Sequence, residues 1–169
     1  MSLNAVQQQI QSYLAGLPSQ GYPGALDARV EQPVGEFAKL GTPLVFIWGA
    51  AGHETRLALP RPDATVGRGP GWKQDAHTVS LWIFALAQAS DPDRAWKFPV
   101  LIRTVCKTLA SVTPMPAPLT DPQTGETSTL LNLGEEFTWD YDIDRTVADQ
   151  RMVRNVCRLD VTALEEFNA

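Results

Sequence analysis

Cysteine and histidine are scarce in this sequence of 169 residues, which contains two of each. Cys106 and Cys157 stand far apart and outside any paired-cysteine motif, which argues against zinc binding and redox chemistry. His53 and His77 are equally isolated, and a catalytic metal usually takes three protein ligands. We therefore expect no metal site, no cofactor and two buried free thiols, and the sequence leaves a disulfide between them open.

Long hydrophobic runs and an excess of basic residues are also missing. No run of about 18 apolar residues occurs, so we expect no membrane-spanning segment. The net charge is −5, whereas a protein that grips nucleic acid through its phosphates usually shows a basic stripe. The first residues lack the basic region and apolar run of a signal peptide. These features predict synthesis in a cytoplasm, without a membrane partner or a tightly held nucleic acid.

Recognisable catalytic motifs are lacking as well. Asp140, Asp142 and Asp144 alternate as in a calcium-binding loop, but Arg145 stands where that loop needs glycine and Arg151 where it needs glutamate. No serine lies in a nucleophile elbow, and no group of glycines continues into the lysine of a phosphate-binding loop. We interpret the three aspartates as a solvated turn and expect no catalytic residue.

The residues that are present have the composition of a globular domain, with 44% hydrophobic and 20% charged residues. Apolar residues at steps of three and four predict helices over 3–17 and 90–112, with Pro99 kinking the second or marking its first turn. Alternating patterns predict extended segments. These are a short segment at 28–34, a hairpin of 44–48 and 54–59 around a turn at 49–52, and strands at 75–86, 130–139 and 153–164.

Proline and glycine predict long loops at 60–74 and 113–127. With these loops, residues 1–169 are expected to form one α+β domain, a single mostly antiparallel β-sheet with two α-helices packed on one face. The strand at 75–86 is apolar on both sides toward its end, so we expect it to be central or to meet a partner.

Candidate interface residues are positively charged or aromatic and are expected on the first long loop or on the outer face of the last strand. They are Arg61, Arg68, Trp72, Lys73, Arg154 and Arg158. Five tryptophans are more than a domain of this size needs for its core, and tryptophan and arginine are enriched in protein interfaces. Trp72 either contacts another subunit or folds back over the edge of the sheet.

Residues 132–166, which read NLGEEFTWDYDIDRTVADQRMVRNVCRLDVTALEE, carry a family resemblance. A strand with a Gly-Glu-aromatic pattern, an acidic-aromatic turn, an arginine-containing connection and a long last strand resemble the final part of tail terminator and related head-tail completion proteins of long-tailed bacteriophages. The preceding order of helix, hairpin, strand 77–86 and a helix carrying Ile102, Val105 and Leu109 is similar too.

The resemblance implies a structural virion protein rather than an enzyme. It implies a homo-oligomeric ring of six copies, assembled in the host cytoplasm, that ends the tail tube and joins it to the head-tail connector. DNA would pass through the lumen of this ring without specific binding, which suits an acidic protein. Two alternatives remain open. One is a neck, adaptor or other tail-tube-related ring protein of the same particle, and the other is a non-viral α+β binding module or small enzyme.

Overall fold

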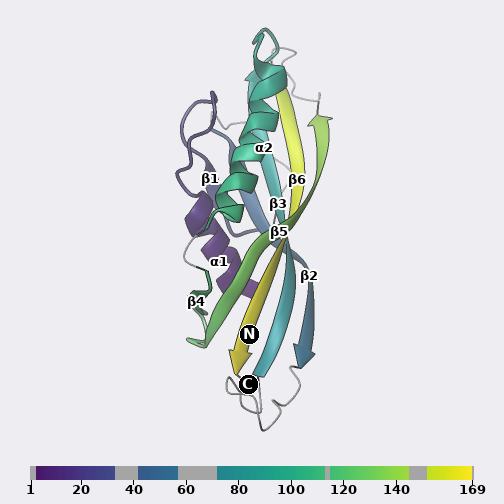
Figure 1. The fold of residues 1–169 in the computed structure, drawn as a ribbon. Helices are drawn as coiled ribbons and strands as arrows, with labels where there is room; N and C mark the ends of the chain where they lie inside the picture. The colour runs from purple at the N-terminus through teal and green to yellow at the C-terminus, as the bar shows by residue number, and fades with distance from the viewer. Residues whose placement is uncertain (1–2, 33–41, 57–71, 113–114, 145–151, 169) are drawn as a thin grey trace.

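The computed structural model describes most of the chain, with two helices and six strands (Figure 1). The described residues are 3–32, 42–56, 72–112, 115–144 and 152–168. The elements in chain order are α1 (Leu3–Leu14), β1 (Asp27–Arg29), β2 (Leu44–Arg56), β3 (Trp72–Gln88), α2 (Arg94–Ala110), β4 (Ala117–Thr120), β5 (Thr127–Asp144) and β6 (Met152–Asn168).

The six strands form one sheet in the order β1-β2-β3-β6-β5-β4, and this sheet curls along its length (Figure 1). β1 pairs with β2 in parallel, whereas the other neighbouring strands run antiparallel. The α+β class is therefore confirmed, but the expected mostly antiparallel sheet is corrected to a mixed one. The reason is the return of the chain from α1 into an edge strand that runs in the direction of β2.

Both helices pack on the same face of the sheet, as the sequence predicts. Their apolar stripes join one core cluster with the inward-facing residues of β2, β3 and β6. The fully buried members include Val6, Ile10 and Leu14 of α1, Leu101 and Val105 of α2, Ile47 of β2, Leu81 and Ile83 of β3, and Cys157, Leu159 and Val161 of β6. Local helical and alternating periodicity was sufficient to identify this core face.

The predicted hairpin at 44–59 is wrong, because β2 runs without a turn from Leu44 to Arg56. The small residues of the expected turn form a β-bulge instead, with a register shift between Gly49 and Ala51. Gly49 has a packing role in this bulge, since a Cβ there would lie 1.9 Å from Leu3 Cδ2. β2 pairs along its length with β3, not with a second half of itself.

Both predicted long loops are shortened by strands. Residues 60–71 of the first loop lie outside the described residues. Residues 72–74 belong to β3, because all three pair with the end of β6 and residues 73 and 74 also pair with β2. Within the expected loop at 113–127, residues 117–120 form β4, which pairs with the beginning of β5. Pro118 is compatible with this strand because β4 lies at the edge of the sheet, where a missing amide donor costs no ladder bond.

The aspartates at 140–144 form no turn, because the strand β5 continues through Asp144. In the pairing with β6, Asp140 is opposite Arg158, Asp142 is opposite Val156 and Asp144 is opposite Arg154. The last strand is confirmed and is longer than predicted, from Met152 to Asn168. Both helices are confirmed with shifted ends, and Pro99 lies inside α2 beyond its first turn.

Candidate functional site

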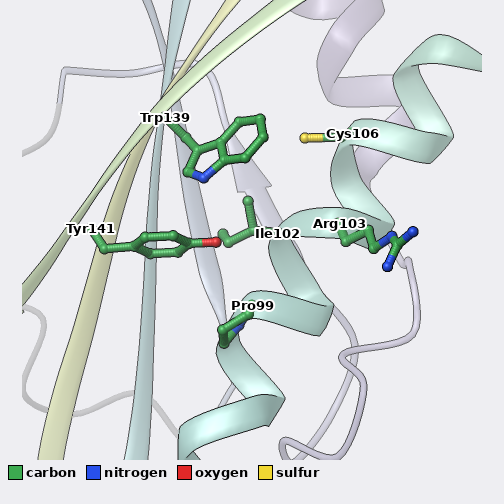
Figure 2. A pocket seen from close by; sticks show the side chains of 6 residues that line it. All are labelled: Pro99, Ile102, Arg103, Cys106, Trp139 and Tyr141. Atoms are coloured by element: carbon green, nitrogen blue, oxygen red, sulfur yellow. The ribbon is translucent and has the colours of Figure 1, made fainter.

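An open groove lies between α2 and β5 on the helix side of the sheet (Figure 2). Its volume is about 360 Å³. The lining residues are mostly apolar or aromatic and are Pro99, Ile102, Arg103, Cys106, Trp139 and Tyr141. Figure 2 shows Trp139 and Tyr141 side by side on the strand and Cys106 and Ile102 facing them from the helix.

Trp139 and Tyr141 face the same side of the sheet as the core, yet water reaches them. They pair with the buried residues Leu159 and Cys157 of β6, but their own exposed fractions are 53% and 45%. β4 accompanies β5 only over Thr127–Leu130, so within the described residues the rest of β5 has no strand on its outer side. An unpaired strand edge beside exposed aromatic rings is a surface suited to another chain.

The chemistry of this groove favours packing over catalysis. Burial raises the pKa of the Cys106 thiol, so the sulfur stays protonated and is a poor nucleophile at neutral pH. Burial also raises the pKa of Tyr141. Phe98 supports the Tyr141 ring edge-to-face at a centroid distance of 6.1 Å. Arg103 is the one charged residue among those that line the groove.

The six predicted interface residues do not form one site. Arg61 and Arg68 lie outside the described residues, as does the side chain of Trp72. Lys73 lies on the core side of β3, where its Nζ is 3.1 Å from Glu54 Oε1 and 6.0 Å from the ring centroid of Phe167.

Arg154 and Arg158 lie on the opposite face, as expected for alternate positions of β6. Arg158 is exposed, forms a 3.0 Å ion pair with Asp160 and lies with its guanidinium 5.9 Å from the centroid of the Trp82 ring. Arg154 is half-buried.

The outer face of the sheet carries a second apolar cluster near Arg158. Leu44 and Phe46 of β2 are buried there and pack against Trp82 and Phe84 of β3. The rings of Phe46 and Phe84 meet edge-to-face at 5.8 Å, and Trp48 continues the row with 44% exposure. β3 is thus a central strand with two apolar faces, as predicted from its sequence.

A buried polar cluster, which was not predicted, lies where the beginning of β3 pairs with the end of β6. His77 Nε2 lies 2.9 Å from Glu165 Oε2, and Asp75 belongs to the same group. All three side chains are buried, and Glu165 has no exposed surface. Burial raises the pKa of the Asp75 carboxyl, while the charge of His77 opposes that shift. The signal in the sequence was Glu165, an acidic residue that continues the inward-facing positions of the last strand one residue beyond its predicted end.

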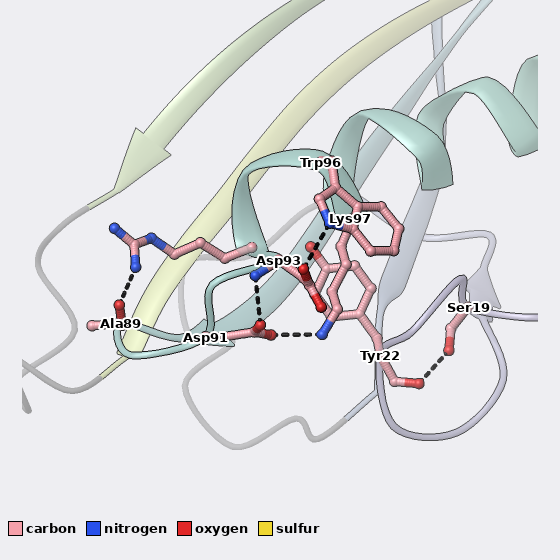
Figure 3. Close-up of polar contacts among 8 residues, drawn as sticks. Ser19, Tyr22, Ala89, Asp91, Asp93, Trp96 and Lys97 are labelled. Atoms are coloured by element: carbon pink, nitrogen blue, oxygen red, sulfur yellow. Dashed lines mark hydrogen bonds and ion pairs between the residues drawn. The ribbon is translucent and has the colours of Figure 1, made fainter.

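The start of α2 is tied to the end of β3 by a polar network that has a structural role (Figure 3). Asp91 accepts hydrogen bonds from Lys97 Nζ at 2.6 Å and from the amide of Asp93 at 2.9 Å. The bond from Lys97 is the main cause that lowers the pKa of Asp91. Trp96 Nε1 donates to Asp93 Oδ1 at 3.0 Å, and Arg94 donates to the carbonyl of Ala89. These contacts hold the start of α2 against the turn that follows β3.

No protein-family model matches the sequence, and no curated protein does. Neither α1 nor α2 has the length and apolar character that a membrane crossing requires. Of the two cysteines, Cys157 is buried and Cys106 half-buried, and both are free thiols.

Proposed function

We propose that this protein is a structural subunit of a virus particle. In this proposal it forms a ring, of six copies by the family resemblance, that ends the tail tube of a long-tailed bacteriophage and joins the tube to the head connector. The observation that carries the proposal is the aromatic groove beside the unpaired part of β5, because it is a docking surface without the chemistry of an active site.

A ring of identical subunits needs two different, complementary patches on each subunit. The groove with Trp139 and Tyr141 provides one patch, since buried aromatic residues supply much of the binding energy in interfaces. The edge of β5 adds backbone donors and acceptors that an extended segment of a neighbour can pair with. The outer face, with Trp48, Trp82 and Arg158, is a candidate for the second patch.

The resemblance and the strand side of the groove fall on the same part of the chain. Residues 132–166 include most of β5 and β6, and Trp139 and Tyr141 lie within the acidic-aromatic stretch that carries the resemblance. An acidic subunit is also suited to a channel for DNA, because it offers few cations to hold the phosphates.

The mass of the purified protein tests the proposal. Native mass spectrometry and negative-stain images are expected to show a sixfold ring, or a ring that forms when tail tubes are added. A larger ring would favour a neck or adaptor protein of the same particle. A protein that stays monomeric with and without tubes would contradict the proposal in both forms.

Two tryptophan variants test the place of the interface. Trp139→Ala should weaken subunit association by about 2 kcal/mol or more, about 30-fold in the dissociation constant, if Trp139 is an interface anchor. Trp96→Ala is the matched control, because Trp96 is 50% exposed, against 53% for Trp139, and lies on α2, outside both the groove and the outer face of the sheet. If Trp96→Ala dissociates the ring and Trp139→Ala does not, the groove is not the subunit interface, although the proposal of a ring would still hold.

A further inference from the structure

Asp75, His77 and Glu165 are brought together by the pairing of β3 with β6. Asp75 is directly opposite Glu165 in this pairing, and His77 is two residues further along β3 on the same face. One ligand atom from each side chain lies within 4.8 Å of the other two. We propose that these three residues bind a divalent transition-metal ion, with zinc as the ion whose ligand preferences they fit.

Unsatisfied oxygen atoms in the cluster support a cation. Asp75 Oδ1 and Glu165 Oε1 are buried, and neither has a hydrogen-bond partner among the described residues. Asp75 is 8% exposed and Glu165 is fully buried, so solvent contributes little to their hydration. Buried carboxylate oxygens without partners are unfavourable unless a proton or a metal ion occupies them.

The charges of the cluster also match a divalent ion. Two carboxylates face one imidazole, so even a protonated His77 leaves one negative charge. Glu54 of β2 is opposite Asp75 of β3 and is a third carboxylate next to the cluster. Its charge is offset by an ion pair with Lys73. A divalent cation bound by a neutral His77 and the carboxylates of Asp75 and Glu165 makes the group neutral overall.

The ligand set and spacing select the class of metal. An imidazole nitrogen with carboxylate oxygens suits zinc and its transition-metal neighbours, whereas calcium and magnesium prefer sites made of oxygen alone. Two ligands of a tetrahedral zinc ion, each about 2.0–2.1 Å from the metal, lie about 3.3 Å apart. The 2.9 Å between His77 Nε2 and Glu165 Oε2 is close to this value, so a small separation of the two side chains is sufficient.

Such a site would act as a staple between strands. It would join the beginning of β3 to the end of β6, at the position where Glu54 of β2 is opposite Asp75. Metal binding at a site that only the folded chain assembles stabilises the folded state. The expectation of a metal-free protein rested on the separation of the ligands in the sequence. His77 and Glu165 are 88 residues apart in the chain, but the pairing of β3 with β6 brings their side chains together.

The test uses protein with a histidine-free tag, stripped with a chelator and titrated with Zn²⁺ in competition with a chromophoric chelator. We expect one zinc ion per chain and a melting temperature that rises with Zn²⁺ but not with equal concentrations of Mg²⁺ or Ca²⁺. Bound Co²⁺ should show d–d absorption without a thiolate charge-transfer band, since neither cysteine belongs to the cluster. A wild-type protein that takes up no zinc would overturn the proposal without reference to any variant.

Two histidine variants locate the ion. His77→Gln should weaken zinc binding more than about 100-fold, because loss of a direct ligand should exceed the cost of losing a residue that merely orients one. His53→Gln is the matched control, because His53 is the other histidine of the chain and lies exposed on β2. If His77→Gln fails to fold, Asp75→Asn replaces it as the ligand variant. Equal zinc affinity in wild type and a folded ligand variant would place the ion elsewhere and contradict the assignment.

Discussion

Phe137 folds back over Gly134 within β5, so closely that a Cβ on Gly134 would lie 2.5 Å from Phe137 Cζ. Gly134 has a φ of 72°, and the register between β5 and β6 shifts between Leu133 and Phe137. This glycine therefore combines a left-handed backbone with a close contact at the point where β5 bulges.

We predict that Gly134→Ala destabilises the subunit by about 2–5 kcal/mol, since the φ penalty of about 1–2 kcal/mol adds to an overpacking cost of about 1–3 kcal/mol. Gly125→Ala is the matched control, because Gly125 has a φ of 73° but no atom within 4 Å of the added Cβ. Gly125→Ala should therefore show the φ penalty of about 1–2 kcal/mol without the overpacking cost. Urea unfolding curves of both variants measure the difference, and equal losses would mean that the Phe137 contact has no energetic role.

Gly134 also shows how far the sequence can predict this fold. The sequence predicts a strand at 130–139, and β5 bulges at Gly134 within this stretch but continues to Asp144. Helices and strands were predictable where a periodic pattern fills the element, as in α1 and β6. The error at 44–59 has a different cause. A Gly-Ala-Ala-Gly stretch is equally compatible with a turn and with a bulge, and the pairing of β2 with β3 decides between them.

The candidate sites were harder to predict because they depend on register. Cys106 and Trp139 belong to separate elements, α2 and β5, and the packing of the helix on the sheet brings them to one groove. His77 was considered isolated for the same reason, since its partner Glu165 is brought to it by the pairing of β3 with β6. Periodicity shows which face a residue occupies, but not which distant residue lies beside it.

Alkaline pH should destabilise the protein through two buried groups. Burial raises the pKa of Cys157 to about 12 from 9.0 and that of Tyr22 to about 12 from 10.0. The folded state therefore keeps protons that the unfolded chain has released. Their contribution to stability is complete below pH 9 and should be lost as the pH rises through about 9 to 12.

The variant Tyr22→Phe isolates one of these groups. It removes the phenolic proton but keeps the ring in the core, so the unfolding free energy should fall less steeply with pH than in the wild type. Urea midpoints measured at several values between about pH 8 and pH 11 give both slopes. Identical slopes would show that the Tyr22 hydroxyl does not contribute.

The two thiols should differ in reactivity. Cys106 lines the groove and is half-buried, whereas Cys157 is fully buried with a pKa of about 12. A maleimide should label Cys106 slowly in the free subunit, faster as the pH rises, and leave Cys157 unmodified until the protein unfolds. Assembly should protect Cys106 if the groove is the subunit interface. Peptide mapping by mass spectrometry identifies the labelled residue, and equal labelling of Cys106 before and after assembly would argue against that interface.

The two faces of β6 should respond differently to substitution. Leu159 is fully buried in the core, and its truncation in Leu159→Ala should cost about 2–5 kcal/mol of unfolding free energy. Arg158 lies beside it on the outer face, where the ion pair with Asp160 is partly exposed and worth about 0–1 kcal/mol. Arg158→Glu should therefore leave the melting temperature nearly unchanged.

The reversal of charge should act on association instead, because Arg158 lies over Trp82 on a face that carries other exposed apolar residues. If a neighbouring subunit or ring docks on this face, Arg158→Glu weakens the complex, and the difference from wild type shrinks as added salt screens the charges. Melting temperature and native mass, measured for Leu159→Ala and Arg158→Glu at low and high salt, separate the two effects. An Arg158→Glu subunit that melts early but assembles normally would show that the outer face serves the fold and not the assembly.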